Sequence, residues 1–510
     1  MFLVLCFSLF GLWIIQKAME FYRNVKAIGY HPGSRKILGE SHPVVLLWRI
    51  LGWEDSDRVF EKKYQTFHDA GWDIISEVSA FPPGVRFDVT DDALIKEITS
   101  SRSCFPKPVK LYEVLSVFGS NIVASEGERW KKYRKICAPA FSDANNKLVW
   151  DETMKTMQEL FHDVWGDEEI STSENVLDVT LAISQFIIGI AGFGRNMSWQ
   201  KESNIPEGHN MTFRDALSGT CHGSLIKIFV PRLTMGLTAR WRQVRAAYDE
   251  FELYMLEMIR DRRTSHEKEE RHDLLSSLLD ANEGDISYLS EGELMGNIFI
   301  FFLAGHETTA HTLAYAFTLL ALYPDVQEKL YQHIDSIIPD NRVPTYETLP
   351  LFTYSLAVFN ETLRMFPVVT AIPKISAEDT VLIATSATGE RATIPVPKGA
   401  SIFLDVPGLH YNPRYWKDPD TFNPSRFLGD WPKEAFMPFS LAARACLGRG
   451  FAETEAIAVI TILISRYKIE VTEELQFRGE TFEEKKKRLL KSKGSVLLTP
   501  LRMPLTFRRR

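Results

Sequence analysis

The sequence predicts a mainly α-helical protein with small β-sheets. Helical patterns dominate residues 130–341, among them the amphipathic segment 241–263 and the apolar segment 298–321. Strand and helix patterns do not alternate along the chain, which argues against a doubly wound α/β fold. Short segments rich in β-branched residues occur late in the chain, at 381–384, 393–396, 401–406 and 496–507.

The composition is that of an ordinary globular protein. Hydrophobic residues make up 45% and charged residues 25% of the 510 residues, which excludes extensive disorder. The 59 basic and 66 acidic residues give a net charge of −7, so no nucleic-acid partner is expected. Length alone favours about three domains. The five cysteines include no C-x-x-C pair, which argues against a disulfide framework or a zinc ribbon.

The N-terminus predicts a membrane anchor. Residues 2–15 are apolar except for Ser8 and Gly11, and the basic residues of this region follow the run rather than precede it. By the positive-inside rule the rest of the chain lies in the cytosol. We therefore expect a single-pass signal anchor within residues 1–28 and a separate domain over 29–510. A buried or cleaved helix is the alternative.

Cys446 is the most informative residue of the chain. It lies between Arg444 and Gly448, just before the apolar helix expected over 451–464. Helix N-terminal amides together with Arg444 supply the positive potential that a thiolate needs. A glycine at 448 lets a flat ligand come close to the backbone beside the sulfur. The alternative is a buried, inert cysteine.

The apolar helix over 298–321 carries Glu307 and Thr308 in its middle. Acid and hydroxyl groups there are costly unless they are satisfied or used. Gly305 and the threonines beside it predict a local distortion of the helix. A capped or water-filled kink is the alternative to a functional pair.

A zinc motif is excluded in the same helix. His306-Glu307 and His311 resemble H-E-x-x-H, but the two histidines are five residues apart rather than four. Five helical steps turn His311 by about 140° from His306, so the two cannot share a metal.

An ion-pair network is predicted around Glu361 and Arg364. The two residues are three apart on one helix face, among apolar neighbours, and Arg426 lies between aromatic residues further on. These surroundings favour a buried network over an ordinary surface salt bridge.

Trp130 and Arg134 form the last motif. They are four residues apart, share a helix face, and are both donors suited to a carboxylate partner. Lys131, Lys132 and Lys135 make another part of this helix basic.

In this order and spacing, Trp130, Thr308, Glu361 and Cys446 resemble the cytochrome P450 haem-thiolate monooxygenases, over roughly residues 32–508. The resemblance is to eukaryotic, membrane-anchored members of fungal character. It implies one mostly helical domain with a small β region, in place of three domains. It also implies haem b as cofactor, bound between the Thr308 helix and the Cys446 loop.

The resemblance assigns roles to the motif residues. Cys446 would be the axial ligand of the haem iron, Glu307 and Thr308 would relay protons, and Glu361, Arg364 and Arg426 would form the structural network behind the cysteine loop. Further haem contacts would come from Arg444, Trp130, Arg134, Lys374, Phe439 and Gly448. Two positions depart from the family pattern: Ala442 stands where glycine is usual, and Lys374 where arginine is frequent. Lysine still neutralises a propionate but lacks the bidentate fork.

The resemblance further implies an apolar pocket and an apolar small-molecule substrate such as a terpenoid, sterol, fatty acid or aromatic polyketide. Segments 105–122, 213–229 and 494–496 would contribute to the walls. The residues expected nearest the substrate are Phe301, Phe302, Ala304, Val369 and Ile372.

The expected activity is insertion of one oxygen atom from O2, in secondary metabolism or in lipid or xenobiotic oxidation. The chain has no P-loop, and a fused reductase would need a much longer chain, so electrons would come from NADPH–cytochrome P450 reductase, with cytochrome b5 as a further partner. The reductase would dock on the basic face of Lys131, Lys132 and Lys135, at the endoplasmic reticulum membrane.

Two alternatives remain open. One is a haem-thiolate isomerase or dehydratase acting on a peroxide, which needs neither external electrons nor the Glu307–Thr308 pair. The other is a non-catalytic haem-binding sensor. NADPH consumption on adding reductase separates the three.

Overall fold

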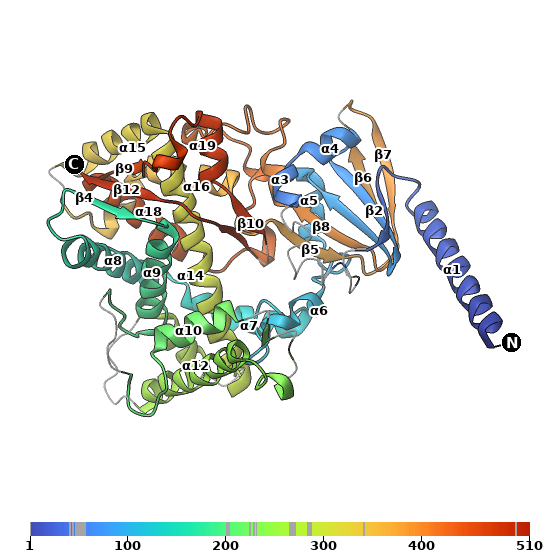
Figure 1. Ribbon diagram of the computed structural model, residues 1–510, viewed down its shortest axis with the longest axis horizontal. Helices are drawn as coiled ribbons and strands as arrows, with labels where there is room; N and C mark the ends of the chain where they lie inside the picture. The colour runs from blue at the N-terminus through green and yellow to red at the C-terminus, as the bar shows by residue number, and fades with distance from the viewer. Residues whose placement is uncertain are drawn as a thin grey trace.

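The computed structural model describes residues 2–39, 42, 45, 58–199, 205–223, 226–227, 230, 232–264, 272–282, 288–339, 342–386, 388–494 and 497–510. The fold is mainly helical, as predicted (Figure 1). The helices are α1 (Phe2–Ala27), α3 (Arg58–Lys62), α4 (Gln65–Ala70), α5 (Asp92–Ser100), α6 (Val109–Tyr112), α7 (Gly127–Cys137), α8 (Asp143–Glu159), α9 (Val176–Ile187), α10 (Phe213–His222), α12 (Ala239–Thr264), α13 (Leu274–Asn282), α14 (Glu291–Leu322), α15 (Pro324–Ile337), α16 (Thr353–Met365), α17 (Val406–His410), α18 (Arg449–Arg466) and α19 (Phe482–Leu489).

The strands form four small sheets. The largest has the order β1-β2-β3-β8-β5, and the others pair β4-β12-β9, β6-β7 and β10-β11. In the largest sheet β1 and β2 are parallel, as are β3 and β8, and the other pairs are antiparallel. The strands are β1 (Gly33–Leu38), β2 (Ile74–Phe81), β3 (Pro83–Val89), β4 (Ile170–Ser173), β5 (Ala371–Ile375), β6 (Thr380–Thr385), β7 (Arg391–Val396), β8 (Ser401–Asp405), β9 (Tyr467–Val471), β10 (Ser492–Gly494), β11 (Leu498–Pro500) and β12 (Leu505–Arg509).

The long helices agree with their apolar periodicity. The predicted segments 241–263, 298–321 and 451–464 correspond to α12, α14 and α18. The start of α14 is fixed by a capping box: the Ser290 hydroxyl accepts from the Glu293 N–H, and the Glu293 carboxylate accepts from the Ser290 N–H. Figure 1 shows α14 running through the helical part of the molecule, where it packs on α9, α16 and α18.

The prediction of a local distortion in α14 was wrong. The helix is continuously α-helical through residues 304–309, and the Thr308 hydroxyl bonds the carbonyl oxygen of Ala304 within the same helix. Gly305 serves close packing instead. A Cβ built on it would lie 2.8 Å from Ile188 Cδ1, in the turn that follows α9.

The strand predictions were partly wrong. Segments 381–384, 393–396 and 401–406 correspond to β6, β7 and β8, but residues 498–509 form two separate strands, β11 and β12, where one was expected. Strands β1, β2 and β3, which build most of the largest sheet, were not predicted. They are joined to β8, more than 300 residues later, by pairing that local patterns do not encode.

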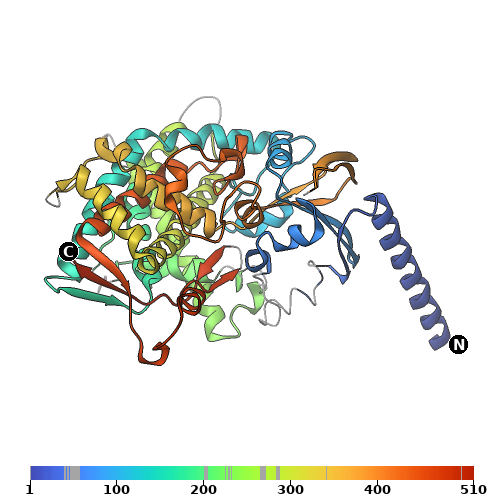
Figure 2. The ribbon, with the colours of Figure 1, turned by 90° about the horizontal axis from the view of Figure 1, so that it is seen from above.

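Helix α1 extends away from the body, beside the largest sheet (Figures 1 and 2). Its side chains Phe7 and Leu12 are 73% and 64% exposed. Its final turns pack on the body through Phe21 and Val25, and Ile28, just beyond it, is fully buried. Within the described part of the chain, no helix combines the length and the apolar character needed to cross a membrane.

Candidate haem site

A cavity of about 370 Å³ separates α14 from the loop that carries Cys446. Cys446, Phe439 and Gly448 line it from the loop, and Ala304 and Thr308 line it from α14. The two motifs that looked chemically informative in the sequence therefore face one another across one space, although 138 residues separate Thr308 from Cys446 (446 − 308).

The cysteine loop is a tight turn. The Cys446 N–H donates to the Phe439 carbonyl oxygen at 2.9 Å, and Ser440 and Ala442 adopt φ values of +61° and +56°. Ala442 thus occupies the left-handed region that favours glycine. The alanine Cβ makes this backbone conformation strained. The Cys446–Phe439 hydrogen bond of the turn is nevertheless formed, so alanine in place of the family's glycine does not open the loop.

The Cys446 side chain is accessible from the cavity but surrounded by protein on its other sides. Burial raises the pKa of its thiol, while the Gly448 N–H and the charges of Arg134 and Arg449 act to lower it. The expected contribution of helix-end amides is present in the Gly448 N–H. Arg444 was also expected to lower the pKa of the Cys446 thiol, but its guanidinium is turned toward Glu126 and Trp130 instead.

Arg444 and Arg134 lie at one edge of the cavity with Trp130. Arg444 pairs with Glu126 at 2.7 Å, donates to the Ser125 carbonyl oxygen at 2.8 Å, and stacks 4.1 Å from the centre of the Trp130 ring. Its buried Nε has no hydrogen-bond partner among the described residues. Arg134 donates to the Ala445 carbonyl oxygen at 3.0 Å, which fastens α7 to the cysteine loop.

Two lysines add to this edge. Lys374, on β5, is 5% exposed, and burial lowers its pKa. Lys107 donates to the Val123 carbonyl oxygen at 2.7 Å, and burial, then the charges of Arg444 and Lys374, lower its pKa to about 7. Glu126 alone cannot balance this group of cations, so the edge suits an anionic ligand such as the propionates of haem.

Lys107 lies in the predicted wall segment 105–122 but was not singled out, and Arg102, which stacks 4.7 Å from the centre of the Trp130 ring, was not predicted as a site residue. They lie in a loop before α6 without a motif of their own. Only the cluster of basic residues at 102, 107 and 110 in the sequence could have pointed to them.

Four of the five predicted pocket residues line the cavity: Phe301, Ala304, Val369 and Ile372. Phe302 was wrong. It is fully buried on another face of α14, where its ring stacks on Phe193 with centroids 3.7 Å apart. The α14 residues that line the cavity form one broad stripe (300, 301, 304, 305, 308, 309 and 312), and Phe302 lies just outside that stripe.

The three pocket segments contribute unequally. Lys107, Tyr112 and Ile122 of segment 105–122 line the cavity, whereas none of the described residues of 213–229 does. Ser495 and Val496 lie outside the described residues.

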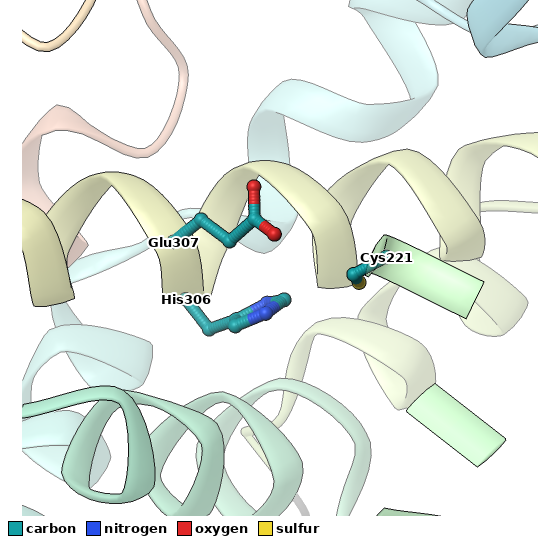
Figure 3. Close-up of side chains that lie close together, drawn as sticks. All are labelled: Cys221, His306 and Glu307. Carbon is teal, nitrogen blue, oxygen red and sulfur yellow. The ribbon is translucent and has the colours of Figure 1, made fainter. Parts of the chain in front are cut away.

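Thr308 and Glu307 point in different directions. The Thr308 hydroxyl lies at the cavity and donates to the Ala304 carbonyl oxygen at 2.8 Å. Glu307 is not among the lining residues, and its carboxylate lies close to the side chains of Cys221 and His306 (Figure 3). Any transfer of a proton from Glu307 to Thr308 therefore requires a rotation of Glu307 or a bridging water.

The predicted buried network is present. Arg364 Nε and Glu361 Oε2 lie 2.7 Å apart, both side chains have no exposed surface, and Arg426 Nε lies 3.0 Å from Glu361 Oε1. Arg364 also donates to the carbonyl oxygens of His410 and Pro419, at 2.9 and 2.8 Å. The network thus ties α16 to the chain segments that lead into the cysteine loop.

These features fit haem b. A thiol on one wall, apolar side chains across from it, and a cationic edge with an unpartnered buried guanidinium Nε match an iron porphyrin with two carboxylates. A mainly helical domain with such a site is the architecture of a haem-thiolate protein.

The comparisons with known proteins agree. The family model for Cytochrome P450 matches residues 86–498. "Cytochrome P450 monooxygenase 124" of the fungus Postia placenta is 49% identical, over 100% of this chain and 99% of that protein. "Cyclooctat-9-en-7-ol 5-monooxygenase" of Streptomyces melanosporofaciens is 28% identical, over 74% of this chain and 78% of that protein.

A solved structure, the haem domain of cytochrome P450DA, superposes with a TM-score of 0.74 at 22% identity, covering 94% of this chain and 98% of that one, and so shows the shared fold. The chain belongs to the cytochrome P450 family. It is a haem-thiolate monooxygenase that uses O2 and electrons from a redox partner, and its relatives do not favour the isomerase and sensor alternatives.

Proposed function

We propose that this monooxygenase oxygenates an apolar, cyclic, terpenoid-like small molecule in secondary metabolism. The observation that carries the proposal is that Cys446 and Thr308 line the same cavity, together with the apolar side chains of Phe301, Ala304, Val369 and Ile372. A pocket of this kind recognises its ligand by shape and apolar contact. The name of the Streptomyces relative, which specifies a cyclic alkenol, supports this substrate class.

Haem ligated by a cysteine thiolate supplies the activation of O2 and the insertion of one oxygen atom. The protein's own residues do the rest. Phe301, Ala304, Val369 and Ile372 pack against the substrate and exclude water from the reacting face. Thr308 presents a hydroxyl that can hold and pass on a proton there, and Glu307 supplies that proton from the other side of α14.

The cationic edge positions the cofactor. Arg444, Arg134, Lys374 and Trp130 would bind the propionates, and Lys107 would add a further donor; all five line the cavity. The carbonyl contacts of Arg134 and Arg444 hold these side chains in place before any ligand arrives. These side chains would hold the propionate edge of the haem when it binds.

The electron donor is NADPH–cytochrome P450 reductase, with cytochrome b5 as a second partner, and we place its docking surface on α7. Two of the three lysines expected there are already paired, Lys131 with Glu128 at 2.6 Å and Lys132 with Glu293 at 2.8 Å. The exposed Lys135 is therefore the strongest candidate for a contact with an acidic partner. The Arg134–Ala445 contact brings this helix next to the cysteine loop.

We further propose that α1 attaches the protein to the endoplasmic reticulum membrane, with the remaining domain in the cytosol. The exposed apolar side chains of its outer half, such as Phe7, Leu9 and Leu12, support this.

A ligand screen tests the proposed substrate class. Full-length, haem-loaded protein is titrated with cyclic terpenoids, fatty acids and matched charged compounds, and displacement of the haem-bound water is followed as a shift of the Soret band. We expect saturable shifts with apolar cyclic compounds, and NADPH-dependent product carrying one atom of labelled O2 when reductase is added. Shifts confined to strongly charged compounds would refute the proposal.

A further inference from the structure

Cys221, His306 and Glu307 form a second cluster on the side of α14 away from the cavity. Cys221 lies near the end of α10 and the other two on α14, and one potential ligand atom from each lies within 4.8 Å of the others (Figure 3). Cys221 and His306 are 8% and 1% exposed, and Glu307 is half-buried. None of the three lines the haem cavity.

The donor set is that of a zinc site. A thiolate, an imidazole and a carboxylate are all established zinc ligands, and three protein ligands with a fourth position for water are typical of an open site. The ligands come from two helices 85 residues apart in sequence (306 − 221), so the tertiary fold alone brings them together.

The orientation of His306 favours metal binding. Its Nδ1 lies 2.6 Å from the carbonyl oxygen of Phe302, and a carbonyl oxygen can only accept. The proton of the neutral ring is therefore on Nδ1, and the lone pair is on Nε2. A hydrogen bond from the non-ligating nitrogen to a carbonyl oxygen is the usual support of a zinc-binding histidine.

We propose that Cys221, His306 and Glu307 bind one zinc ion. Zinc binding converts the Cys221 thiol to a thiolate, and the displaced proton goes to solvent, so no oxidant or reductant is needed. At zinc–ligand distances of about 2.0–2.3 Å the ligand atoms lie closer together than the 4.8 Å limit observed here, so binding draws the three side chains together, and rotation of the long Glu307 side chain brings its carboxylate to the metal.

Bound zinc holds Glu307 away from Thr308. Zinc should therefore slow substrate oxygenation. This consequence rests on the proton-supply role proposed for Glu307, whereas the binding site itself does not. Metal binding and turnover are accordingly measured separately, so that failure of one is distinguishable from failure of the other.

The test uses full-length, haem-loaded protein that shows the thiolate spectrum, so that Cys446 is occupied by iron. Residual metal is removed by dialysis against a chelator, and zinc is then titrated in competition with a fluorescent chelator. We expect one equivalent to bind, with an absorption fine structure at the zinc edge that includes a single sulfur at about 2.3 Å.

Variants define the ligands. Cys221→Ala and His306→Gln should each weaken zinc binding more than 100-fold, beyond the 10–100-fold typical of an outer-shell partner. Cys137→Ala removes another buried thiol that lies outside the cluster and should bind zinc as the parent does. If Cys221→Ala fails to incorporate haem, the zinc affinity of His306→Gln tests the proposal in its place. Absence of stoichiometric binding, a zinc site without sulfur, or unchanged affinity in the folded variants would overturn the proposal.

Discussion

The imidazole of His410 links the buried Glu361–Arg364 pair to the cysteine loop through Met437. Its Nε2 accepts from the Met437 N–H at 3.1 Å, and its Nδ1 donates to the Arg364 carbonyl oxygen, also at 3.1 Å. Nε2 can accept only while the ring is neutral. Burial and the charge of Arg364 lower the pKa of His410 to about 3, which keeps it neutral.

Acid should therefore weaken the fold around Cys446. The pKa of His410 is about 3 in the folded protein and near 6.5 in the unfolded chain, so the unfolded chain binds the additional proton between these values. The contribution of neutral His410 to the free energy of unfolding is complete above about pH 6.5. It declines on acidification by about 1.4 kcal/mol per pH unit. Urea unfolding at several pH values, followed by the thiolate band of the carbon monoxide complex, measures this slope.

His410→Gln provides the control for this prediction. Glutamine keeps a neutral acceptor and donor but does not titrate. The free energy of unfolding should therefore depend less on pH between about pH 5 and 6.5, by an amount that corresponds to the uptake of about one proton. Other buried histidines, such as His311, are common to both proteins and cancel in the comparison. An identical slope in the variant would rule out His410 as the source.

Ala442→Gly should stabilise the cysteine loop. The φ of +56° at Ala442 costs a residue with a Cβ about 1–2 kcal/mol, and the greater freedom of glycine in the unfolded chain offsets about 0.4–1 kcal/mol of this. A net gain between about 0 and about 1.6 kcal/mol in the free energy of unfolding is expected from unfolding curves. Ala445→Gly is the matched control, because Ala445 has a φ of −54° and should lose stability on the same change. A loss of stability in both variants would contradict this prediction.

Cys446→Ser should abolish the red-shifted carbon monoxide band and all oxygenation. A hydroxyl does not replace a thiolate as electron donor to iron. Cys137→Ser changes a fully buried thiol that does not line the cavity and should keep the band. Spectra of the ferrous carbon monoxide complexes make the comparison. A thiolate band in Cys446→Ser would assign the ligand to another cysteine.

Thr308→Ala should keep the thiolate band but lower product formed per NADPH consumed. Removal of a proton-transfer group slows its step by about 10²–10⁴-fold, and reducing equivalents are then lost as peroxide. Thr318→Ala is the control, because its hydroxyl makes the same bond to the carbonyl four residues earlier, at 2.8 Å, without lining the cavity. Full coupling in Thr308→Ala would make its hydroxyl purely structural.

Deletion of residues 2–19 should release the protein from microsomal membranes and leave haem content unchanged. The deletion ends before Phe21, Val25 and Ile28, which pack on the body. Deletion of residues 2–28 removes these contacts as well and should lower the thermal midpoint, since a buried isoleucine contributes about 2–5 kcal/mol. Sedimentation with microsomes and the haem-to-protein ratio are measured for both. Retention of the shorter variant on membranes would exclude α1 as the anchor.

Much of the site could be predicted because its chemistry is local in sequence. Cys446 and Gly448 share one turn, Glu361 and Arg364 one helix face, and the helices that carry them follow their apolar periodicity. Ala442, noted in the sequence only as standing where glycine is usual, adopts a positive φ in the structure.

The direction of side chains around α14 could not be predicted from the sequence. Phe301 and Phe302 were both predicted to line the pocket, yet only Phe301 belongs to the stripe of α14 that faces it, and the position of that stripe is set by how α14 packs on its neighbours. Glu307 likewise lies outside the stripe that contains Thr308.

The sequence by itself determined the class of fold and the Glu361–Arg364 pair, because periodicity and the i,i+3 spacing are properties of residues a few positions apart. Only the tertiary structure decided that Lys107 joins the cationic edge, that His410 connects Arg364 to Met437, and that Cys221 meets His306 and Glu307. These contacts join segments that are distant along the chain. Periodicity and spacing encode which face of an element is buried, but not which distant element covers it.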